Sequence, residues 1–260
     1  MAEEKLSFRW KKLRLNSNFL LPKLIGHRGV KDLKPENTFE SILTAFDLGL
    51  ECVEIDVKIS KDCIPLLLHD DTLDRTTDGF GLVCDYTFDE INKLDAGYFF
   101  YKSKTEIKVP SLKSILDLVK KKEKYLNIEL KPNKNHEELN VKKVLQEIKQ
   151  NSYDKIYFSS FDLSSCVNLK DSAPNLLCGF LNDDFNKINI KDTVDICKKY
   201  NLFSCGINLN FFNNSIISQF MENDIQVTVY SDNNITKEQA QNLWSNNVAS
   251  IFVDDPSEYF

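Results

Sequence analysis

Short aliphatic runs alternate with longer amphipathic stretches along the whole chain. Apolar segments of strand length, bounded by polar turns, are typical of buried strands. They predict strands at 24–27, 52–59, 64–69, 125–130, 156–159, 176–181, 205–209, 226–230 and 250–253. Because stretches with helical spacing separate most of these runs, the pattern predicts repeated βα units. We therefore expect an α/β fold with a largely parallel sheet.

The number of predicted strands bears on the architecture. Nine runs are one more than a closed eight-stranded βα barrel needs. The surplus falls between 52 and 69, where Lys61-Asp62-Cys63 leaves room for a turn but not for a helix. Either a hairpin or a short strand outside the barrel would account for it.

Helix signals precede several of the amphipathic stretches. Asn37 is expected to be an N-cap, with Glu40 three residues later completing a capping box. Ser111 precedes a similar pattern of apolar residues. Further helices are expected at 137–149, 194–200, 215–223 and 237–245.

One stretch, about 70–110, interrupts the βα alternation and is too long for an ordinary barrel loop. It contains a turn at 78–81, a helix-like segment at 87–94 and the aromatic cluster Tyr98-Phe99-Phe100-Tyr101. Long insertions at the carboxyl ends of barrel strands often carry function. The aromatics would suit a substrate cap, with Phe99 as a candidate pocket wall. They would equally suit a surface flap in which they bury one another.

Composition narrows the class of protein. The 260 residues fit one large domain, and the fractions of hydrophobic (42%) and charged (28%) residues are typical of globular proteins. Apolar runs fall short of a bilayer's thickness, so we expect no stable membrane insertion. The net charge of −6 argues against nucleic acid as a partner. The first twelve residues hold no apolar core of signal-peptide length, which favours a cytoplasmic location.

The cysteines also exclude some classes of site. Their number, seven, is odd, and they show no CxxC pair or zinc-ligand spacing. Several lie in apolar runs, where cysteine behaves as a small buried hydrophobe. We expect free thiols and no disulfide framework.

Carboxylates on two predicted strands indicate a metal site. In a strand, residues two apart point to the same face, so Glu54 and Asp56 would share one side. Glu129 occurs late in another strand, with Lys131 on the same side. Buried together, the acids would repel each other unless a cation neutralised them. Ligands made of oxygen favour Mg²⁺ or Ca²⁺, although each acid taken singly could lie on a solvated strand face.

Histidines stand where two buried strands are expected to end. His27 follows Leu24-Ile25 and His69 follows Leu66-Leu67-Leu68, whereas the third histidine, His136, lies in a polar run and is expected at the surface. Histidine transfers protons near neutral pH. Arg28 and Lys131 would bind phosphate oxygens, or else pair with the neighbouring acids. Together these groups suit metal-assisted cleavage of a phosphate ester.

The chain resembles the glycerophosphodiester phosphodiesterase family in a series of short motifs. They are His27-Arg28-Gly29, Pro35-Glu36-Asn37-Thr38, Glu54-Ile55-Asp56-Val57, His69-Asp70 with Leu73-Asp74-Arg75-Thr76-Thr77, Glu129-Leu130-Lys131, Ser159-Ser160-Phe161-Asp162 and Asp254-Asp255-Pro256. Each motif is weak by itself, but their order and spacing are specific and extend over nearly the whole chain from Lys23. The resemblance implies a distorted TIM-type (β/α)8 barrel over 23–260, with a small inserted segment after the third strand.

The resemblance also implies the activity and the roles of residues. It implies metal-dependent hydrolysis of small glycerophosphodiesters to glycerol 3-phosphate and an alcohol, within glycerol and lipid metabolism. The acid/base histidines would be His27 and His69, and one Mg²⁺ or Ca²⁺ would bind Glu54, Asp56 and Glu129. Arg28 and Lys131 match phosphate-contacting residues, and Glu36 would have a supporting role.

The chain departs from the family pattern at two places. Where a Trp-Thr pair is usual in a late strand, this sequence has Thr228-Val229-Tyr230, so Tyr230 is a candidate pocket wall. Cys63 replaces a usual turn glycine. Two other functions stay open: a lysophospholipase D or phospholipase-like phosphodiesterase acting on lipids, and a non-catalytic binding module on the same barrel. Residues 1–22 are expected to pack on the barrel as an extension.

Overall fold

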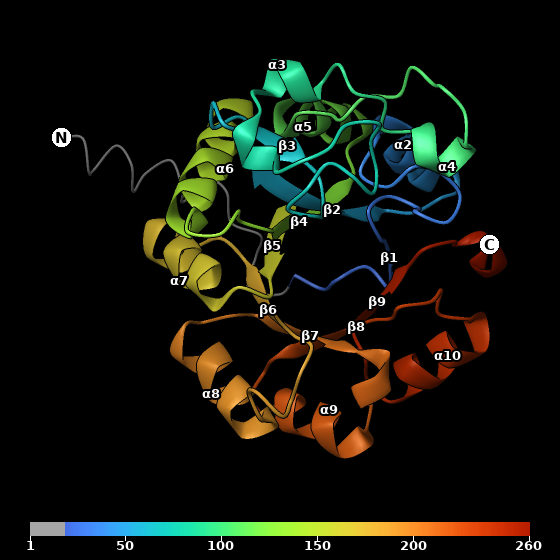
Figure 1. Cartoon of the computed structure of the whole chain (residues 1–260). Coiled ribbons are helices and arrows are strands. Elements are labelled where there is room, and N and C mark those ends of the chain that lie inside the picture. Colours follow the sequence, from blue (N-terminus) through green and yellow to red (C-terminus); the bar gives the residue numbers. More distant parts are fainter. Residues whose placement is uncertain (1–18) are drawn as a thin grey trace.

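In the computed structural model, which describes residues 19–260, eight parallel strands close into a ring (Figure 1). Strand β1 pairs with both β2 and β9, which closes the barrel. The fold prediction is therefore confirmed. The strands of the ring are β1 (Leu24–Gly26), β2 (Cys52–Ile59), β4 (Tyr125–Leu130), β5 (Ile156–Ser160), β6 (Cys178–Asn182), β7 (Ser204–Asn208), β8 (Gln226–Tyr230) and β9 (Ser250–Val253).

The surplus strand lies outside the ring. Strand β3 (Pro65–Leu67) pairs antiparallel with the end of β2, in the register Val57 to Leu67. It is thus a hairpin partner and also a strand outside the barrel, so both proposed explanations of the count hold. Cys63 in the connecting turn has φ +61°, a left-handed conformation that favours glycine. This conformation accounts for the glycine of the family pattern.

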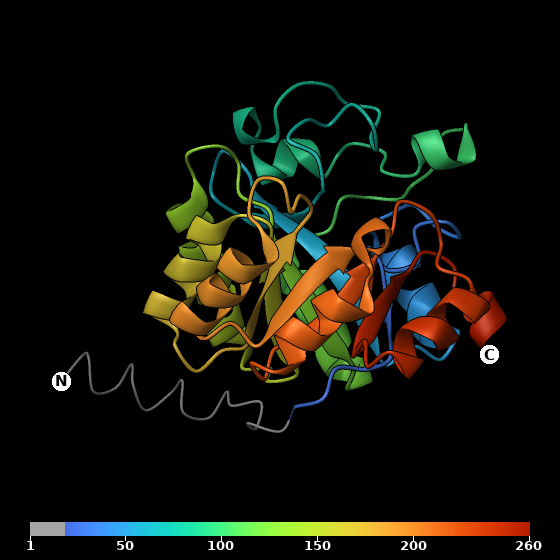
Figure 2. The same cartoon turned by 90° about the horizontal axis from the view of Figure 1, so that it is seen from below.

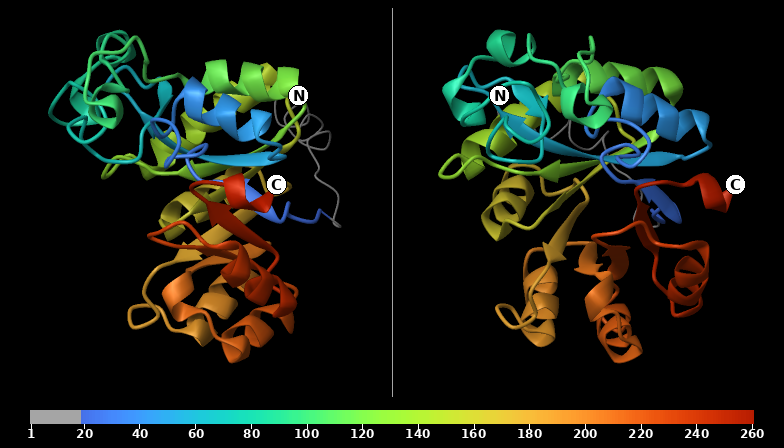
Figure 3. Two further views of the ribbon diagram at one scale, coloured as in Figure 1. Left: turned by 90° about the vertical axis from the view of Figure 1, so that its right-hand side faces the viewer. Right: turned by 45° about the vertical axis from the view of Figure 1, so that its right-hand side comes forward.

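Helices surround the barrel, as the two views of Figure 3 show. Their apolar faces pack on the outward side chains of the strands, for example Leu112, Ile115, Leu116 and Val119 of α5. The surrounding helices are α2 (Phe39–Asp47), α5 (Leu112–Lys122), α6 (Glu137–Asn151), α7 (Leu163–Ser172), α8 (Ile190–Lys199), α9 (Asn214–Met221) and α10 (Lys237–Ser245). Helix α7 was not predicted, because its buried side includes Ser165 and Lys170 and its apolar spacing is correspondingly weak.

The predicted cap of the first helix is wrong by one residue. Thr38, not Asn37, is the N-cap of α2, and its side chain accepts a hydrogen bond from the backbone N–H of Ser41. Asn37 instead has φ +58° and turns its amide toward the barrel. The Ser111 cap of α5 is confirmed.

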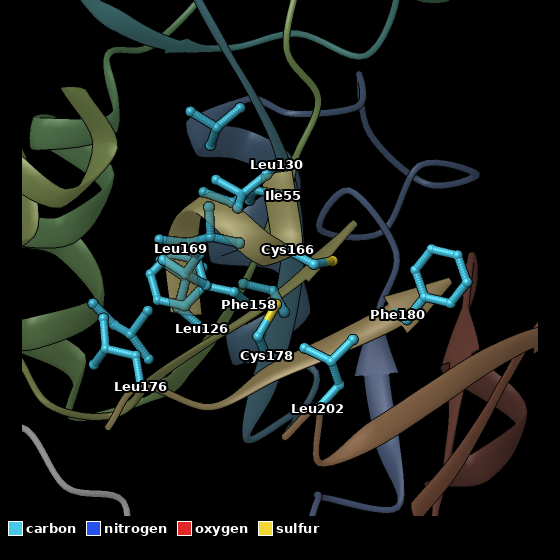
Figure 4. Close-up of a cluster of buried hydrophobic side chains, with 14 of the residues drawn as sticks. Ile55, Leu126, Leu130, Phe158, Cys166, Leu169, Leu176, Cys178, Phe180 and Leu202 are labelled. Atoms are coloured by element: carbon cyan, nitrogen blue, oxygen red, sulfur yellow. The ribbon is translucent and has the colours of Figure 1, made fainter. Parts of the chain in front are cut away.

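Alternate residues of the strands face two different environments. On β2, Val53, Ile55 and Val57 belong to the core beneath the helices, while Glu54 and Asp56 point into the barrel. Figure 4 shows part of this core, in which Phe158 of β5 lies near Leu169 and Cys166 of α7. All seven cysteines fall within the described range and are free thiols, as predicted.

The segment between β3 and α5 stands above the barrel, at the end toward which the strands point (Figure 2). It contains a 3-10 turn (Val83–Asp85) and two short helices, α3 (Phe88–Ile91) and α4 (Tyr98–Tyr101). The helix expected at 87–94 is therefore shorter, and the aromatic cluster is itself helical. A small core of its own supports this segment: Leu66, Leu68, Leu73, Val83, Ile91, Ala96 and Val109.

The opposite end of the barrel is covered by the start of the described chain. The ring of Phe19 packs on Tyr125, Tyr157 and Phe203, with centroids 5.5, 5.8 and 6.3 Å away. The predicted extension, 1–22, falls largely outside the described residues, so its packing stays a prediction. Between 19 and 260, none of the helices combines the length and the apolar character that a membrane span requires.

Candidate active site

Carboxylates from two neighbouring strands meet inside the barrel. Asp56 of β2 lies beside Glu129 of β4 in the sheet register, and Glu54 lies two residues before Asp56. One oxygen of each carboxylate lies within 4.8 Å of the others. All three side chains are buried, Glu54 and Asp56 to 1% exposure. The structure thus brings together the acids that the sequence singled out as metal ligands.

The acids do not share their charge equally. Burial raises the pKa of Glu54 well above its usual value, and the charges of Asp56 and Glu129 add to this effect. Burial likewise raises the pKa of Glu129 to about 7. Burial also acts on Asp56, but Arg28 and Lys131 outweigh it and lower that pKa to about 2. Concentrated negative charge of this kind favours a bound cation.

The donor set fits a hard divalent ion. One oxygen of Glu54, Oε2, accepts a hydrogen bond from the backbone N–H of Arg28 at 2.9 Å. The other, Oε1, is buried and lacks a hydrogen-bond partner among residues 19–260. A buried oxygen left in this way is costly unless something else binds it. Oxygen ligands at this spacing suit Mg²⁺ or Ca²⁺.

Asp56 is held in place from the side of the first βα loop. Asn37 Nδ2 donates to Asp56 Oδ2 at 2.8 Å, and the side-chain oxygen Oδ1 of Asn37 accepts from the Asp56 backbone N–H at 3.0 Å. Arg28 Nε lies 3.3 Å from Asp56 Oδ2. The left-handed backbone of Asn37 permits this double contact. Asn37 therefore supports the carboxylate cluster, a role that the expected helix cap concealed.

Basic side chains border the acids. Lys131 Nζ lies 3.0 Å from Glu129 Oε1 and 3.8 Å from Asp56 Oδ1. The guanidinium of Arg28 binds Glu36 through Nη1 at 2.9 Å. Arg28 and Lys131 thus pair with acids, one of the two alternatives left open by the sequence, and both also line the cavity described below. Binding of phosphate oxygens by these two residues stays a prediction.

Each of the two predicted histidines is bound by a carboxylate. His27 Nδ1 lies 2.7 Å from Asp254 Oδ1, and Lys31 Nζ lies 2.8 Å from the other oxygen of Asp254. His69 Nδ1 lies 2.6 Å from Asp70 Oδ1. Burial lowers the pKa of both histidines, against the opposing effect of the neighbouring carboxylates. A neutral imidazole that is oriented through Nδ1 presents Nε2 for proton transfer.

Arg75 joins the two sides of the site. Its Nε and Nη2 donate to Asp70 at 2.6 and 3.0 Å, and its Nη1 and Nη2 donate to Glu36 at 2.7 and 2.8 Å. Glu36 in turn binds Arg28. The charge and hydrogen bonds of Arg75 lower the pKa of Asp70 far below its usual value, so Asp70 stays ionised beside His69.

A cavity of about 280 Å³ opens among these groups. Its polar lining includes His27, Arg28, Glu54, His69, Glu129 and Lys131, and its apolar lining includes Phe161, Leu181, Tyr230 and Phe252. The ring of Tyr230 meets Phe161 edge-on, with centroids 5.6 Å apart. Phe99 lines a separate hollow beside Glu36 and Arg75. The structure thus places Tyr230 in the cavity with the predicted site residues, and Phe99 outside it.

The sequence predicted no role at the active site for Asp254, Asp70, Arg75 or Asn37, and for Asn37 it predicted only a helix cap. A signal was available for two of them, since Asp254 directly follows the apolar run 251–253 and Asp70 directly follows His69. Arg75 and Asn37 lie in loops, and no periodicity predicts where a loop side chain reaches. His136 is the N-cap residue of α6 and is not among the residues that line this cavity.

Comparisons with known proteins bear on the family of this chain. The sequence model of the glycerophosphoryl diester phosphodiesterase family matches residues 27–258. A glycerophosphodiester phosphodiesterase from Caldanaerobacter subterraneus is 36% identical over 159 residues, which cover 61% of this chain and 65% of the relative. A protein of the same name from Bacillus altitudinis is 26% identical over 245 residues, covering 91% and 96% of the two chains.

The fold is also found among solved structures. A phosphodiesterase from Oleispira antarctica, solved in complex with the product sn-glycerol-3-phosphate, superposes with a TM-score of 0.85. The two proteins are 29% identical, and the superposition covers 91% of this chain and 94% of the other.

Proposed function

This chain belongs to the glycerophosphoryl diester phosphodiesterase family, and we propose that it hydrolyses glycerophosphodiesters to glycerol 3-phosphate and an alcohol. The observation that carries this proposal is the pairing of His27 and His69 across one cavity. Each imidazole has its own carboxylate at Nδ1, and the cavity between them is lined by Arg28 and Lys131. Hydrolysis of a phosphodiester needs a general base, a general acid and positive charge at the phosphate.

The histidines would act through their Nε2 atoms. Although burial acts to raise the pKa of Asp254, the hydrogen bonds from His27 and Lys31 hold it below its usual value, so the carboxylate is ionised. An ionised carboxylate only accepts hydrogen bonds, so His27 donates through Nδ1. The same holds for His69 and Asp70. Nε2 of each ring is then the nitrogen that takes up or gives a proton.

The bond changes follow from this arrangement. One histidine removes a proton from the attacking hydroxyl while its oxygen bonds to phosphorus. The other histidine, which must start this step as the imidazolium, gives its Nε2 proton to the oxygen of the departing alcohol as the bond between that oxygen and phosphorus breaks. The attacking hydroxyl belongs either to water or to the glycerol of the substrate, which would form a cyclic phosphate first. Either histidine can serve first, since both have the same kind of partner.

Glu54, Asp56 and Glu129 would hold one Mg²⁺ or Ca²⁺. When bound, such an ion supplies Lewis-acid chemistry and neutralises charge on the phosphodiester. The support for this site is the buried Glu54 Oε1, which lacks a hydrogen-bond partner in the described part of the chain. Arg28 and Lys131 would hold phosphate oxygens from the rim, and Glu36 keeps Arg28 in position.

The apolar side of the cavity favours a second candidate, hydrolysis of lysophospholipids. Phe161, Leu181 and Tyr230 would contact an apolar group as well as they would contact glycerol carbons. An assay of the purified full chain separates the two. The panel contains glycerophosphocholine, glycerophosphoethanolamine, glycerophosphoglycerol and lysophosphatidylcholine, each with EDTA and then with Mg²⁺ or Ca²⁺ added back.

We expect release of glycerol 3-phosphate and free alcohol from the water-soluble diesters, loss of turnover in EDTA, and recovery with a cation. If the protein hydrolyses lysophosphatidylcholine but none of the soluble diesters, the second candidate replaces the proposal. An unchanged rate in EDTA would contradict the metal site. Failure on every substrate, with either cation present, would favour a non-catalytic binding module.

A further inference from the structure

The insertion displays a cluster of exposed aromatic side chains, residues 97–105, which we call the aromatic tip. Tyr98, Phe99, Phe100 and Tyr101 are exposed by 41, 50, 41 and 41%. They form the single turn of α4, and their rings contact each other edge-on in two pairs. Exposed apolar clusters of this kind mark interaction sites. The aromatics thus bury little of one another, and the flap expected as an alternative does not describe them.

The base of the tip is firmly built. The buried carboxylate of Asp95 accepts hydrogen bonds from the backbone N–H of Gly97, and from the N–H and hydroxyl of Thr105 where the loop returns. The Ala96 N–H also donates to the Ile107 carbonyl at 2.9 Å. The loop is therefore closed at its two ends, and the fold projects the four rings outward from a fixed base.

The charge of the tip is opposite to that of the protein. Between 97 and 105 there are two lysines, Lys102 and Lys104, and no aspartate or glutamate, whereas the chain as a whole carries a net charge of −6. Both lysines are exposed. Aromatic rings with adjacent basic residues are the composition that binds the headgroup region of an anionic bilayer.

The tip also lies on the side of the barrel that holds the cavity. Phe99 and Phe100 line a hollow of about 180 Å³ together with Glu36 and Arg75. Glu36 and Arg75 contact Arg28 and Asp70 of the candidate active site. Figure 2 shows α4 at the periphery of the molecule, beyond the end toward which the strands point. A flat surface bound by the tip would therefore face the active-site end.

We propose that the aromatic tip docks this protein on the surface of an anionic phospholipid bilayer, without crossing it. The rings enter the headgroup region and the two lysines meet the lipid phosphates. This docking is independent of the reaction proposed above, since it rests on the exposed rings, the hydrogen-bonded base of the tip and the local positive charge.

Vesicle flotation of the full chain tests the proposal. The vesicles are phosphatidylcholine with and without phosphatidylglycerol, at low and high salt. Two double variants change the tip: Phe100→Ser with Tyr101→Ser, and Lys102→Glu with Lys104→Glu. A matched control, Met221→Ser, removes a side chain that is 44% exposed on α9, on the far side of the barrel from α4 (Figure 1).

We expect the wild type to float with anionic vesicles and to be released by salt. Each tip variant should partition onto them roughly tenfold more weakly or worse, while Met221→Ser matches the wild type. Turnover of soluble glycerophosphodiesters and the thermal unfolding midpoint should stay unchanged in the tip variants, which separates docking from catalysis and from misfolding.

Four outcomes would overturn the proposal. The first is a wild type that does not float, and the second is a wild type that floats equally with neutral vesicles. The third is binding of the tip variants as strong as that of the wild type. The fourth is a dimer, seen by light scattering, that Phe100→Ser with Tyr101→Ser dissociates; a second copy of this chain, and not a bilayer, would then cover the tip.

Discussion

His27 and Asp254 are joined by a 2.7 Å contact between Nδ1 and Oδ1, although 227 positions separate them in the chain. The barrel brings them together because β1 and β9 are neighbours in the closed ring. His69 has its own carboxylate in the adjacent residue, Asp70. Two imidazoles thus line one cavity, each with a carboxylate at Nδ1. Closure of the barrel supplies the carboxylate of His27, and the next residue in the chain supplies that of His69.

Replacing either histidine tests the proton-transfer roles. His27→Ala and His69→Ala should each lower kcat by roughly 10²–10⁴-fold, because a positioned acid or base contributes about that much. His136→Ala is the matched control, since this residue is the N-cap of α6 and does not line the cavity, and it should keep normal turnover. Near-normal kcat in either cavity variant, measured with glycerophosphocholine, would remove that histidine from the mechanism.

Asp254→Asn should preserve the shape of the site but disturb the orientation and tautomer of His27. Because partners that orient a functional imidazole commonly contribute 10- to 100-fold, we expect kcat to fall by roughly that factor. Asp255→Asn changes the next residue, whose side chain accepts from the Ser257 N–H, and should have little effect on kcat. Equal losses in the two variants would mean that Asp254 acts through folding and not through His27.

Arg75 is expected to be a positioning residue for His69 and Arg28, since it binds both Asp70 and Glu36. Arg75→Ala should lower kcat by roughly 10- to 100-fold, and added guanidinium ion should restore part of it. Arg75→Lys keeps the charge but lacks the forked geometry, so it should recover little. Methylammonium serves as the control ion. Rescue by both ions alike would indicate a general effect of charge.

Asn37→Ala should loosen Asp56, because it removes the two hydrogen bonds that the Asn37 side chain makes. One goes to the Asp56 carboxylate and the other comes from the Asp56 backbone N–H. We expect a loss of about 1–3 kcal/mol in the free energy of unfolding and weaker cation binding by calorimetry. Asn135→Ala controls for backbone strain, since Asn135 has a similar φ of +64° in an exposed loop. If the two variants lose the same stability, the contact with Asp56 has no energetic role.

Cation removal should make stability depend on pH. Burial raises the pKa of Glu129 from 4.5 to about 7, so the cation-free native state binds more protons than the unfolded chain between these values. Stability contributed by the protonated carboxyl is therefore lost as the pH rises through this range. In EDTA, the unfolding midpoint should fall over that interval, and Mg²⁺ should raise it more at the upper end.

Glu129→Gln is the control for this pH dependence, because its side chain stays neutral throughout. The difference between wild type and variant should follow the titration of Glu129, whatever other groups titrate. If Mg²⁺ raises the unfolding midpoint equally at the lower and the upper end of this pH range, in the wild type and in Glu129→Gln alike, a cation site formed by Glu129 is contradicted.

Much of the fold was predictable from local patterns. Apolar runs located every strand, and the short turn at Lys61-Asp62-Cys63 located the one that lies outside the ring. The apolar pattern does not predict helix α7, because Ser165 and Lys170 occupy its buried side. The cap at Asn37 was misplaced because both Asn37 and Thr38 are good capping residues, and a contact with Asp56 decided between them.

The sequence by itself determined which residue types stand at the strand ends, since strand periodicity places Glu54 and Asp56 on one face and ordinary chemistry suggests a cation there. Only the tertiary structure decided which of these side chains are in contact. Closure of the ring brings Asp254 to His27, and the fold of the insertion brings Arg75 to Glu36 and Asp70. The contacts of Asp254 with His27 and of Arg75 with Glu36 join segments that lie 227 and 39 positions apart in the chain. Their formation depends on barrel closure and loop geometry, which no local pattern of hydrophobic and polar residues encodes.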